Sequence, residues 1–197
     1  MIEEKGSFRD PAGSIYYLNQ KVFRKLSKEG EDRLKFITDN NILNESIKDQ
    51  YLIKTSILDK NDINHKFKDK LILEHEKIPF ISYPYEWSFS QLKSAALHHL
   101  NFHLYLLEKG ATLIDSSAYN IQFLGSKPIF IDVLSIKKYE EGEFWTGHKQ
   151  FCESFLNPLV LKSKLGINFN NWFKGNLEGI DTGELSKLLK FRHIFSW

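Results

Sequence analysis

The pattern of apolar and polar positions divides the chain into a β-rich first part and a more helical second part. Alternating residues over 14–18 and 21–26 predict two strands joined by a reversal at Asn19-Gln20. Further strand patterns follow at 51–54 and 70–75. The first part is therefore expected to form a small antiparallel sheet.

Helical spacing governs most of the remaining chain. Residues 28–49 predict two short helices separated at Asn40-Asn41, and 88–109 give the strongest helical pattern. A capping-box pair, Ser88 and Gln91, opens this long helix, and Gly110 suits the position after its end. Two more helices are predicted at 145–161, with an interruption at Pro158, and at 183–189, after a loop over 166–180.

The two parts meet at a proline-rich and aromatic segment. Residues 78–87, IPFISYPYEW, contain two prolines among several large aromatic residues. This composition predicts a rigid, extended connector. We therefore expect one α+β domain, with a β-rich part over 1–82 and a mainly helical part over 83–197.

Composition limits the classes of function. Hydrophobic residues make up 42% of the 197 residues and charged residues 26%, as in an ordinary globular protein. The net charge of +2 favours neither nucleic-acid nor membrane binding. A single cysteine, Cys152, excludes an internal disulfide and suits a reducing compartment. With no signal-peptide pattern and no long apolar run, a cytoplasmic location is expected.

Three polar side chains in residues 113–135 carry the candidate chemistry. Asp115 follows a short apolar run, Asn120 precedes a predicted hairpin, and Asp132 follows that hairpin. Because Mg²⁺ prefers oxygen ligands, Asn120 and Asp132 form a candidate metal site. Asp115 is then available to orient or deprotonate an acceptor hydroxyl. Each residue alone is also an ordinary turn or cap residue.

Two further groups of residues have both a functional and a structural interpretation. The predicted strand 21–26 offers Arg24 or Lys25 as a cation for phosphate groups, although basic residues of a surface hairpin also face water. Acidic residues of the following helix could pair with that cation or remain solvated. His99 and His103 have the spacing of a two-histidine metal site, but without a third ligand we expect core or surface histidines.

Several stretches of the chain resemble a known bacterial family. These are SYPYEWSFSQLKSAALHHL, LIDSSAYNIQF, FIDVLSI and QFCESFLNPL, within a resemblance that covers about residues 8–161. They resemble the kinase-like N-terminal region that precedes a class I S-adenosylmethionine-dependent methyltransferase domain in nodulation-type methyltransferases. That region is distantly similar to protein-kinase-like and aminoglycoside-phosphotransferase-like folds, with a small β-rich N-lobe and a helical C-lobe.

The resemblance implies an ATP site with Mg²⁺ as its metal. Asp115 would take the catalytic-loop role, Asn120 and Asp132 would bind the metal, and Arg24 would replace the usual strand lysine. The sequence departs from the kinase pattern at Leu113, where a histidine is usual, and at Val133-Leu134, which follow the metal aspartate.

Two functions therefore stay open from the sequence. The first is phosphoryl transfer to an unknown small-molecule or protein hydroxyl. The second is a non-catalytic accessory module that binds a methyltransferase domain or protein. The chain contains no glycine-rich strand–loop–helix motif of the G-x-G kind, so methyl transfer by this chain alone is not expected.

Overall fold

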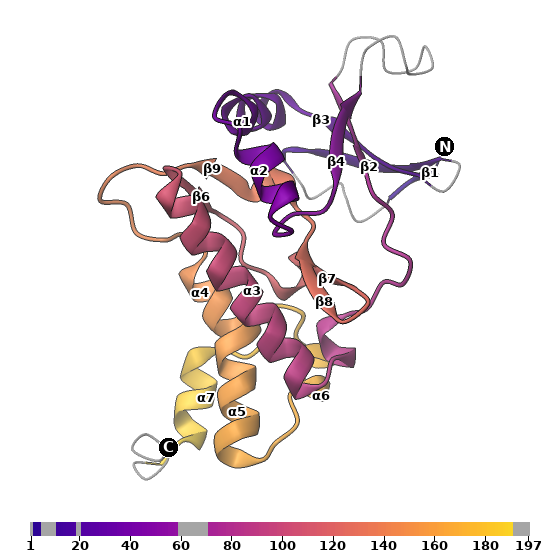
Figure 1. The fold of residues 1–197 in the computed structure, drawn as a ribbon. Coiled ribbons are helices and arrows are strands. Elements are labelled where there is room, and N and C mark those ends of the chain that lie inside the picture. Colours follow the sequence, from indigo (N-terminus) through magenta and orange to yellow (C-terminus); the bar gives the residue numbers. More distant parts are fainter. Residues whose placement is uncertain (1, 5–10, 19–20, 59–70, 191–197) are drawn as a thin grey trace.

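The computed structural model describes residues 2–4, 11–18, 21–58 and 71–190 of the chain (Figure 1). The predicted reversal at Asn19-Gln20 lies outside these residues. The strands are β1 (Ile2–Glu3), β2 (Gly13–Leu18), β3 (Lys21–Leu26), β4 (Thr55–Leu58), β5 (Ile72–His75), β6 (Ala111–Leu113), β7 (Ile121–Leu124), β8 (Lys127–Phe130) and β9 (Ile136–Lys138). The α-helices are α1 (Lys28–Asp39), α2 (Ile42–Lys48), α3 (Phe89–Glu108), α4 (His148–Phe151), α5 (Asn157–Leu165), α6 (Asn170–Gly175) and α7 (Thr182–Leu188).

The structure is a mixed α+β arrangement built around an N-terminal antiparallel sheet. Its strand order is β1-β2-β3-β5-β4, and every neighbouring pair is antiparallel. In Figure 1 the sheet, α1 and α2 occupy one end of the molecule, and α4, α5 and α7 occupy the other. The long helix α3 runs between the two ends, beside the hairpin β7–β8.

Strand register determines which side chains share a face of the sheet. Ile15 pairs with Arg24 and Tyr17 with Val22, while Val22 also pairs with His75 on the next strand. Directly paired residues point to the same face, and alternate residues along a strand do so as well. One face of the sheet therefore carries all five of these side chains.

The predicted strand at 51–54 is wrong, because the strand of the sheet is β4, Thr55–Leu58. The preceding segment instead crosses to the hairpin, where Leu52 and Phe130 form a parallel bridge. The Ile53 amide donates to the carbonyl of Phe130 at 2.9 Å, and the Phe130 amide donates to Tyr51 at 3.0 Å. The apolar pattern at 51–54 thus reflects burial against β8 rather than membership of the sheet.

The helices α1 and α2 confirm the predicted break at Asn40-Asn41. Asn41 has a φ of 57°, in the left-handed region that asparagine tolerates better than most residues. Strand β9 was not predicted, because three residues, Ile136–Lys138, are too few to show an alternating pattern. It pairs with β6 and lies against α1, so it joins the helical part to the N-terminal part.

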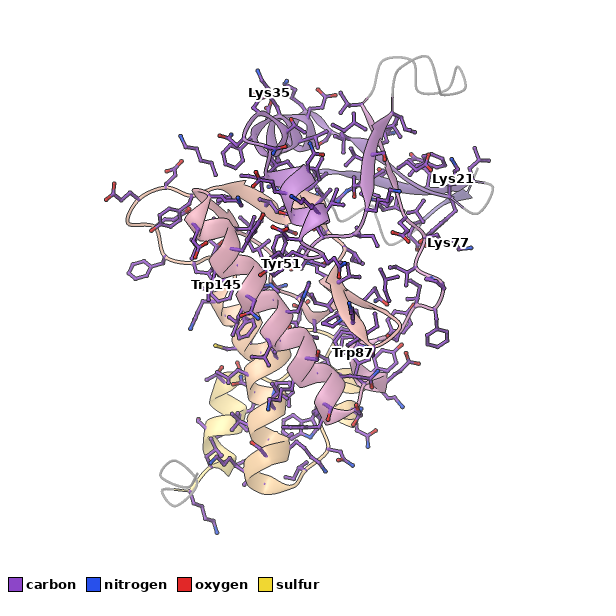
Figure 2. All side chains as sticks on the ribbon, in the orientation of Figure 1. Lys21, Lys35, Tyr51, Lys77, Trp87 and Trp145 are labelled. Carbon is purple, nitrogen blue, oxygen red and sulfur yellow. The ribbon has the colours of Figure 1, made fainter. Side chains whose placement is uncertain are left out.

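Helix α3 confirms its predicted bounds and its capping box. The Ser88 hydroxyl accepts from the Gln91 amide, and the Gln91 side chain accepts from Ser88 N. Gly110 follows the helix with a φ of 69°, as its predicted role requires. Figure 2 shows Tyr51 and Trp145 near the middle of α3, where each ring packs against side chains of that helix.

The second part differs from the prediction in two places. Pro158 does not interrupt the helix over 145–161, because a π-helical turn, Cys152–Leu156, immediately precedes α5. Such a wide turn makes room for proline, which has no N–H and collides with a carbonyl one turn back. The loop predicted at 166–180 contains α6, and the rings of Phe169 at its N-cap and Phe173 within it are buried. No helix in the described ranges is long and apolar enough to cross a membrane.

We predict that Gly30→Ala destabilises the fold although glycine-to-alanine changes in helices are usually favourable. A Cβ at Gly30 would lie 2.2 Å from the carbonyl oxygen of Ala12 and 3.3 Å from Leu134 Cδ1. Overpacking against backbone costs about 1–3 kcal/mol. The control is Gly175→Ala on α6, where a Cβ meets nothing within 4 Å and about 0.5–1 kcal/mol should be gained. Urea unfolding measures both, and equal stability of the two variants would contradict the packing argument.

Candidate functional site

A cavity of about 540 Å³ lies against the face of the sheet that carries Arg24. It is lined by residues of β2, β3, β5, the connector and the segments around the hairpin β7–β8, namely Pro11, Ile15, Tyr17, Val22, Arg24, Ile53, His75, Glu76, Lys77, Ile78, Ile81, Asp115, Asn120, Ile131 and Asp132. Lys77, labelled in Figure 2, belongs to the connector side of the cavity. The lining combines an apolar majority with one cluster of charged and polar groups.

Four of the five residues predicted for the site line this cavity. They are Arg24, Asp115, Asn120 and Asp132. Lys25 does not, because adjacent residues of a strand point to opposite faces. Its ammonium nitrogen lies 5.6 Å from the ring centroid of Tyr16, on the other side of the sheet. Arg24 is thus the strand cation that faces the candidate site.

An ion pair between Arg24 and Asp132 crosses the cavity from β3 to the second residue after β8. The Arg24 side chain is 7% exposed and that of Asp132 is 22% exposed, so the pair is shielded from bulk water. The second carboxylate oxygen of Asp132 accepts from the Ser135 hydroxyl, and Oδ1 also accepts from Leu134 N at 3.3 Å. Burial alone would raise the pKa of Asp132, but the Arg24 charge and these hydrogen bonds outweigh it and lower the pKa.

Asp115 has the opposite shift in the same cavity. Burial, reinforced by the negative charge of Asp132, raises the pKa of Asp115. The Ser117 amide donates to Asp115 Oδ1 at 2.9 Å and opposes this rise only in part. Two carboxyl groups of one site whose pKa values shift in opposite directions typically have different roles, such as base and metal ligand.

Asn120 is positioned by the backbone of the hairpin. Its carbonyl accepts from Ile131 N at 2.9 Å, which places the residues before and after the hairpin side by side. The amide of Asn120 acts on Asp115 by favouring the charged carboxylate. Its Nδ2 is buried and makes no hydrogen bond of normal geometry within the described chain. Because Nδ2 is a buried donor, Oδ1 is the atom of this amide that could ligate a cation.

The donor set of the cavity fits a hard cation better than a soft one. Asp115, Asp132 and the amide of Asn120 provide oxygen atoms, which are the ligands that Mg²⁺ prefers. Within the described ranges no three His, Cys, Asp or Glu side chains gather as a metal cluster. A cation at Asp132 would have to compete with the guanidinium of Arg24.

The histidines of α3 are core residues, in agreement with the structural interpretation of their spacing. His99 is fully buried among the rings of Phe130, Trp145, Phe151 and Phe155. Burial, with a contribution from His103, lowers the pKa of His99 to about 3. His103 Nε2 lies 2.9 Å from the Thr112 hydroxyl. Neither ring belongs to the cavity at Asp132.

Two positioning contacts were not predicted from the sequence. Arg33 of α1 donates to the carbonyl of Leu134 at 2.8 Å and also pairs with Glu29. Ser135 donates to Asp132. Glu29, one of the acidic residues of this helix, therefore pairs within α1 and not with the strand cation. The contact of Arg33 with Leu134 joins residues 101 positions apart, so no local sequence pattern could indicate it.

Comparison with known proteins identifies one relative that covers nearly the whole chain. The chain is 42% identical over 193 residues, or 97% of its length, to nodulation protein NoeA of Rhizobium meliloti (strain 1021). These residues span 40% of that protein, so the chain corresponds to less than half of the relative. No family model matches the chain.

We predict that Asp132→Asn and Asp115→Asn shift stability in opposite directions at neutral pH. Asp132→Asn leaves Arg24 without its carboxylate and should cost about 3 kcal/mol, the lower end for a buried pair that loses one partner. Asp115→Asn removes a charge that burial disfavours and keeps the acceptor for Ser117, so stability should rise.

The pH dependence distinguishes the two carboxylates. The lowered pKa of Asp132 stabilises the fold above the ordinary aspartate pKa, and this stabilisation is lost as pH falls through the lowered value. The raised pKa of Asp115 gives stability that is present at low pH and lost as pH rises through the raised value. Chemical unfolding of both variants from neutral to acid pH measures this. Parallel curves for the two variants would refute the assignment.

Proposed function

We propose that the chain is a kinase-like nucleotide-binding domain with Mg²⁺-dependent phosphotransferase activity toward a hydroxyl acceptor. The observation that carries the proposal is the single cavity lined by Arg24, Asp115, Asn120 and Asp132. These residues come from a strand, a loop and the two ends of a hairpin. Phosphoryl transfer needs this combination of a phosphate cation, metal ligands and a base.

Each side chain has a role that its surroundings support. Asp132, kept charged by Arg24, is suited to hold Mg²⁺, with Asn120 as a second ligand. When bound, Mg²⁺ would neutralise charge on the phosphate oxygens. Arg24, once Asp132 binds a metal, can turn to a phosphate group. Asp115 has a raised pKa, which suits a base that receives a proton from an acceptor hydroxyl.

The order of elements also supports a kinase-like fold. The N-terminal sheet, with its inserted helix pair, precedes the connector at residues 78–87. A long helix, a short strand, a loop with Asp115, a hairpin and Asp132 follow in turn. The same order characterises the two lobes of kinase-type proteins, with the nucleotide between them. Under this proposal residues 1–82 form the N-lobe and 83–197 form the C-lobe.

A non-catalytic accessory module is the second candidate. Leu113 and Val133-Leu134 replace residues that kinases use in catalysis, and the Arg24–Asp132 pair satisfies both charges without a metal. The connector also exposes Phe80 (77%) and Tyr83 (42%), which could contact a partner. The partner suggested by the sequence resemblance is a methyltransferase domain or protein.

The nucleotide proposal predicts Mg²⁺-dependent binding of ATP that requires Asp132. Isothermal titration calorimetry of the wild type should show binding in millimolar Mg²⁺ and much weaker binding with chelator present. Asp132→Ala should weaken binding at least about tenfold, which corresponds to about 1.4 kcal/mol. Asn120→Ala should weaken it in Mg²⁺ and have little effect without the metal, because its role is to hold the ion.

Asp39→Asn is the matched control, because this carboxylate is exposed at the end of α1 and lines no part of the cavity. It should bind ATP as the wild type does. Absence of ATP binding by the folded wild type at millimolar Mg²⁺ would reject the nucleotide proposal. A stable complex with a methyltransferase under those conditions would favour the accessory module.

A further inference from the structure

His75 occupies the end of the cavity where β5 leads into the connector. Its register places it opposite Val22, whereas Arg24 lies opposite Leu73. Two residues along a strand span about 7 Å, so His75 lies about that far along the sheet from the row of Arg24. The residue lines the cavity and is 8% exposed. It is therefore separate from the charged cluster around Asp132 yet opens into the same space.

Hydrogen bonds at Thr55 fix the tautomer of this histidine. The Thr55 hydroxyl oxygen lies 3.0 Å from the Ile53 carbonyl and 2.9 Å from His75 Nδ1. A hydroxyl has one hydrogen to donate. Ile53 is 2% exposed, and in the described chain its carbonyl has no donor besides Thr55. Since an unpaired buried carbonyl is costly, the hydroxyl donates to Ile53 and His75 Nδ1–H donates to the hydroxyl.

The other ring nitrogen, Nε2, is consequently a hydrogen-bond acceptor without a hydrogen. Among the residues that the structure describes, Nδ1 makes the hydrogen bond of His75 and Nε2 receives none. Nε2 is not one of the fully buried side-chain nitrogen and oxygen atoms that lack a hydrogen bond in the described chain, so this nitrogen is accessible to solvent. Burial first, and then the charge of Arg24, lower the pKa of the ring to about 4, against the opposing effect of Asp132. The acceptor therefore persists at neutral pH.

We propose that His75 determines specificity by accepting a hydrogen bond at Nε2 from an N–H or O–H group of the ligand. The inference rests on the proposed nucleotide function for the identity of that ligand. With phosphates at Arg24 and Asp132, the base lies toward His75, among the apolar side chains of Val22, Ile53 and Ile78. The group that meets Nε2 is then an exocyclic amino group of the base.

An acceptor at this position discriminates between purines. Adenine carries an amino donor at the ring position where hypoxanthine and guanine carry a carbonyl oxygen. A carbonyl facing Nε2 leaves two acceptors opposed and the buried histidine unpaired, which costs binding. His75 therefore selects adenine nucleotides over those of hypoxanthine.

The tautomer is tested first and without ligand. Nitrogen-15 NMR of histidine-labelled protein should show His75 with a protonated Nδ1 and an unprotonated Nε2 at neutral pH. Thr55→Val removes the oxygen that accepts from Nδ1, so the proportion of this tautomer should fall. A wild-type His75 with its hydrogen on Nε2 would overturn the inference whatever the nucleotide result.

Selectivity is tested by calorimetry with ATP and inosine triphosphate in Mg²⁺. The wild type should bind ATP about 10- to 100-fold more tightly, as expected for one buried hydrogen bond. His75→Leu should bring the two affinities together, and so should His75→Gln, because its amide can accept from the adenine amino group or donate to the hypoxanthine carbonyl. The control His148→Leu changes an exposed histidine outside the cavity and should keep the full ratio.

The outcomes separate the two proposals. Equal binding of both nucleotides by the wild type overturns the role of His75 and leaves the nucleotide proposal intact. Failure to bind either nucleotide overturns both proposals. Circular dichroism establishes whether His75→Leu is folded. If this variant is not folded, the ratio of the wild-type affinities for ATP and inosine triphosphate and the tautomer of His75 test the proposal.

Discussion

The ion pair between Arg24 and Asp132 is the interaction on which the candidate site depends. It joins β3 to the second residue after β8, 108 positions apart, and shields both charges inside one cavity. A buried ion pair costs desolvation energy and is a poor source of stability compared with apolar packing. Its cost is offset in part by Ser135 and Leu134, which also bind Asp132. The same contacts that keep Asp132 ionised keep it in place for a cation.

Contacts around the ion pair hold the side chains of the candidate site in one arrangement. Arg33 holds the carbonyl of Leu134, so the turn after Asp132 is fixed from α1 as well as from the sheet. The close approach of Gly30 to Ala12 and Leu134 brings α1 near enough for this contact. Asp115, in contrast, depends on the loop before the hairpin and on Ser117. Two carboxylates of one cavity are thus positioned by different parts of the chain.

Much of the local structure could be predicted from the sequence, because local rules determine it. Alternation predicted β2 and β3, Ser88 and Gly110 marked the ends of α3, and turn residues marked the hairpin β7–β8. To choose between Arg24 and Lys25 one must know which face of β3 lines the cavity. That face depends on how β3 pairs with the other strands. Likewise, β9 and the crossing of the chain at Leu52 are defined by partners far away in the sequence. The hydrogen-bonding role of His75 became visible only through its contact with Thr55. Contacts of this range leave no periodic pattern.

The bridge between Leu52 and Phe130 has a consequence for motion. It gives the sheet and the hairpin a backbone connection besides the connector at residues 78–87. A body attached to another along one strand can swing freely, and each further attachment restricts that swing. A widening of the cavity that keeps both attachments is a rocking of the sheet about the line between them, and the contact of Arg33 with Leu134 opposes it from α1. Such a movement would change the separation of Arg24 from Asp132 while leaving the hydrogen bonds of residues 51–53 with β8 in place.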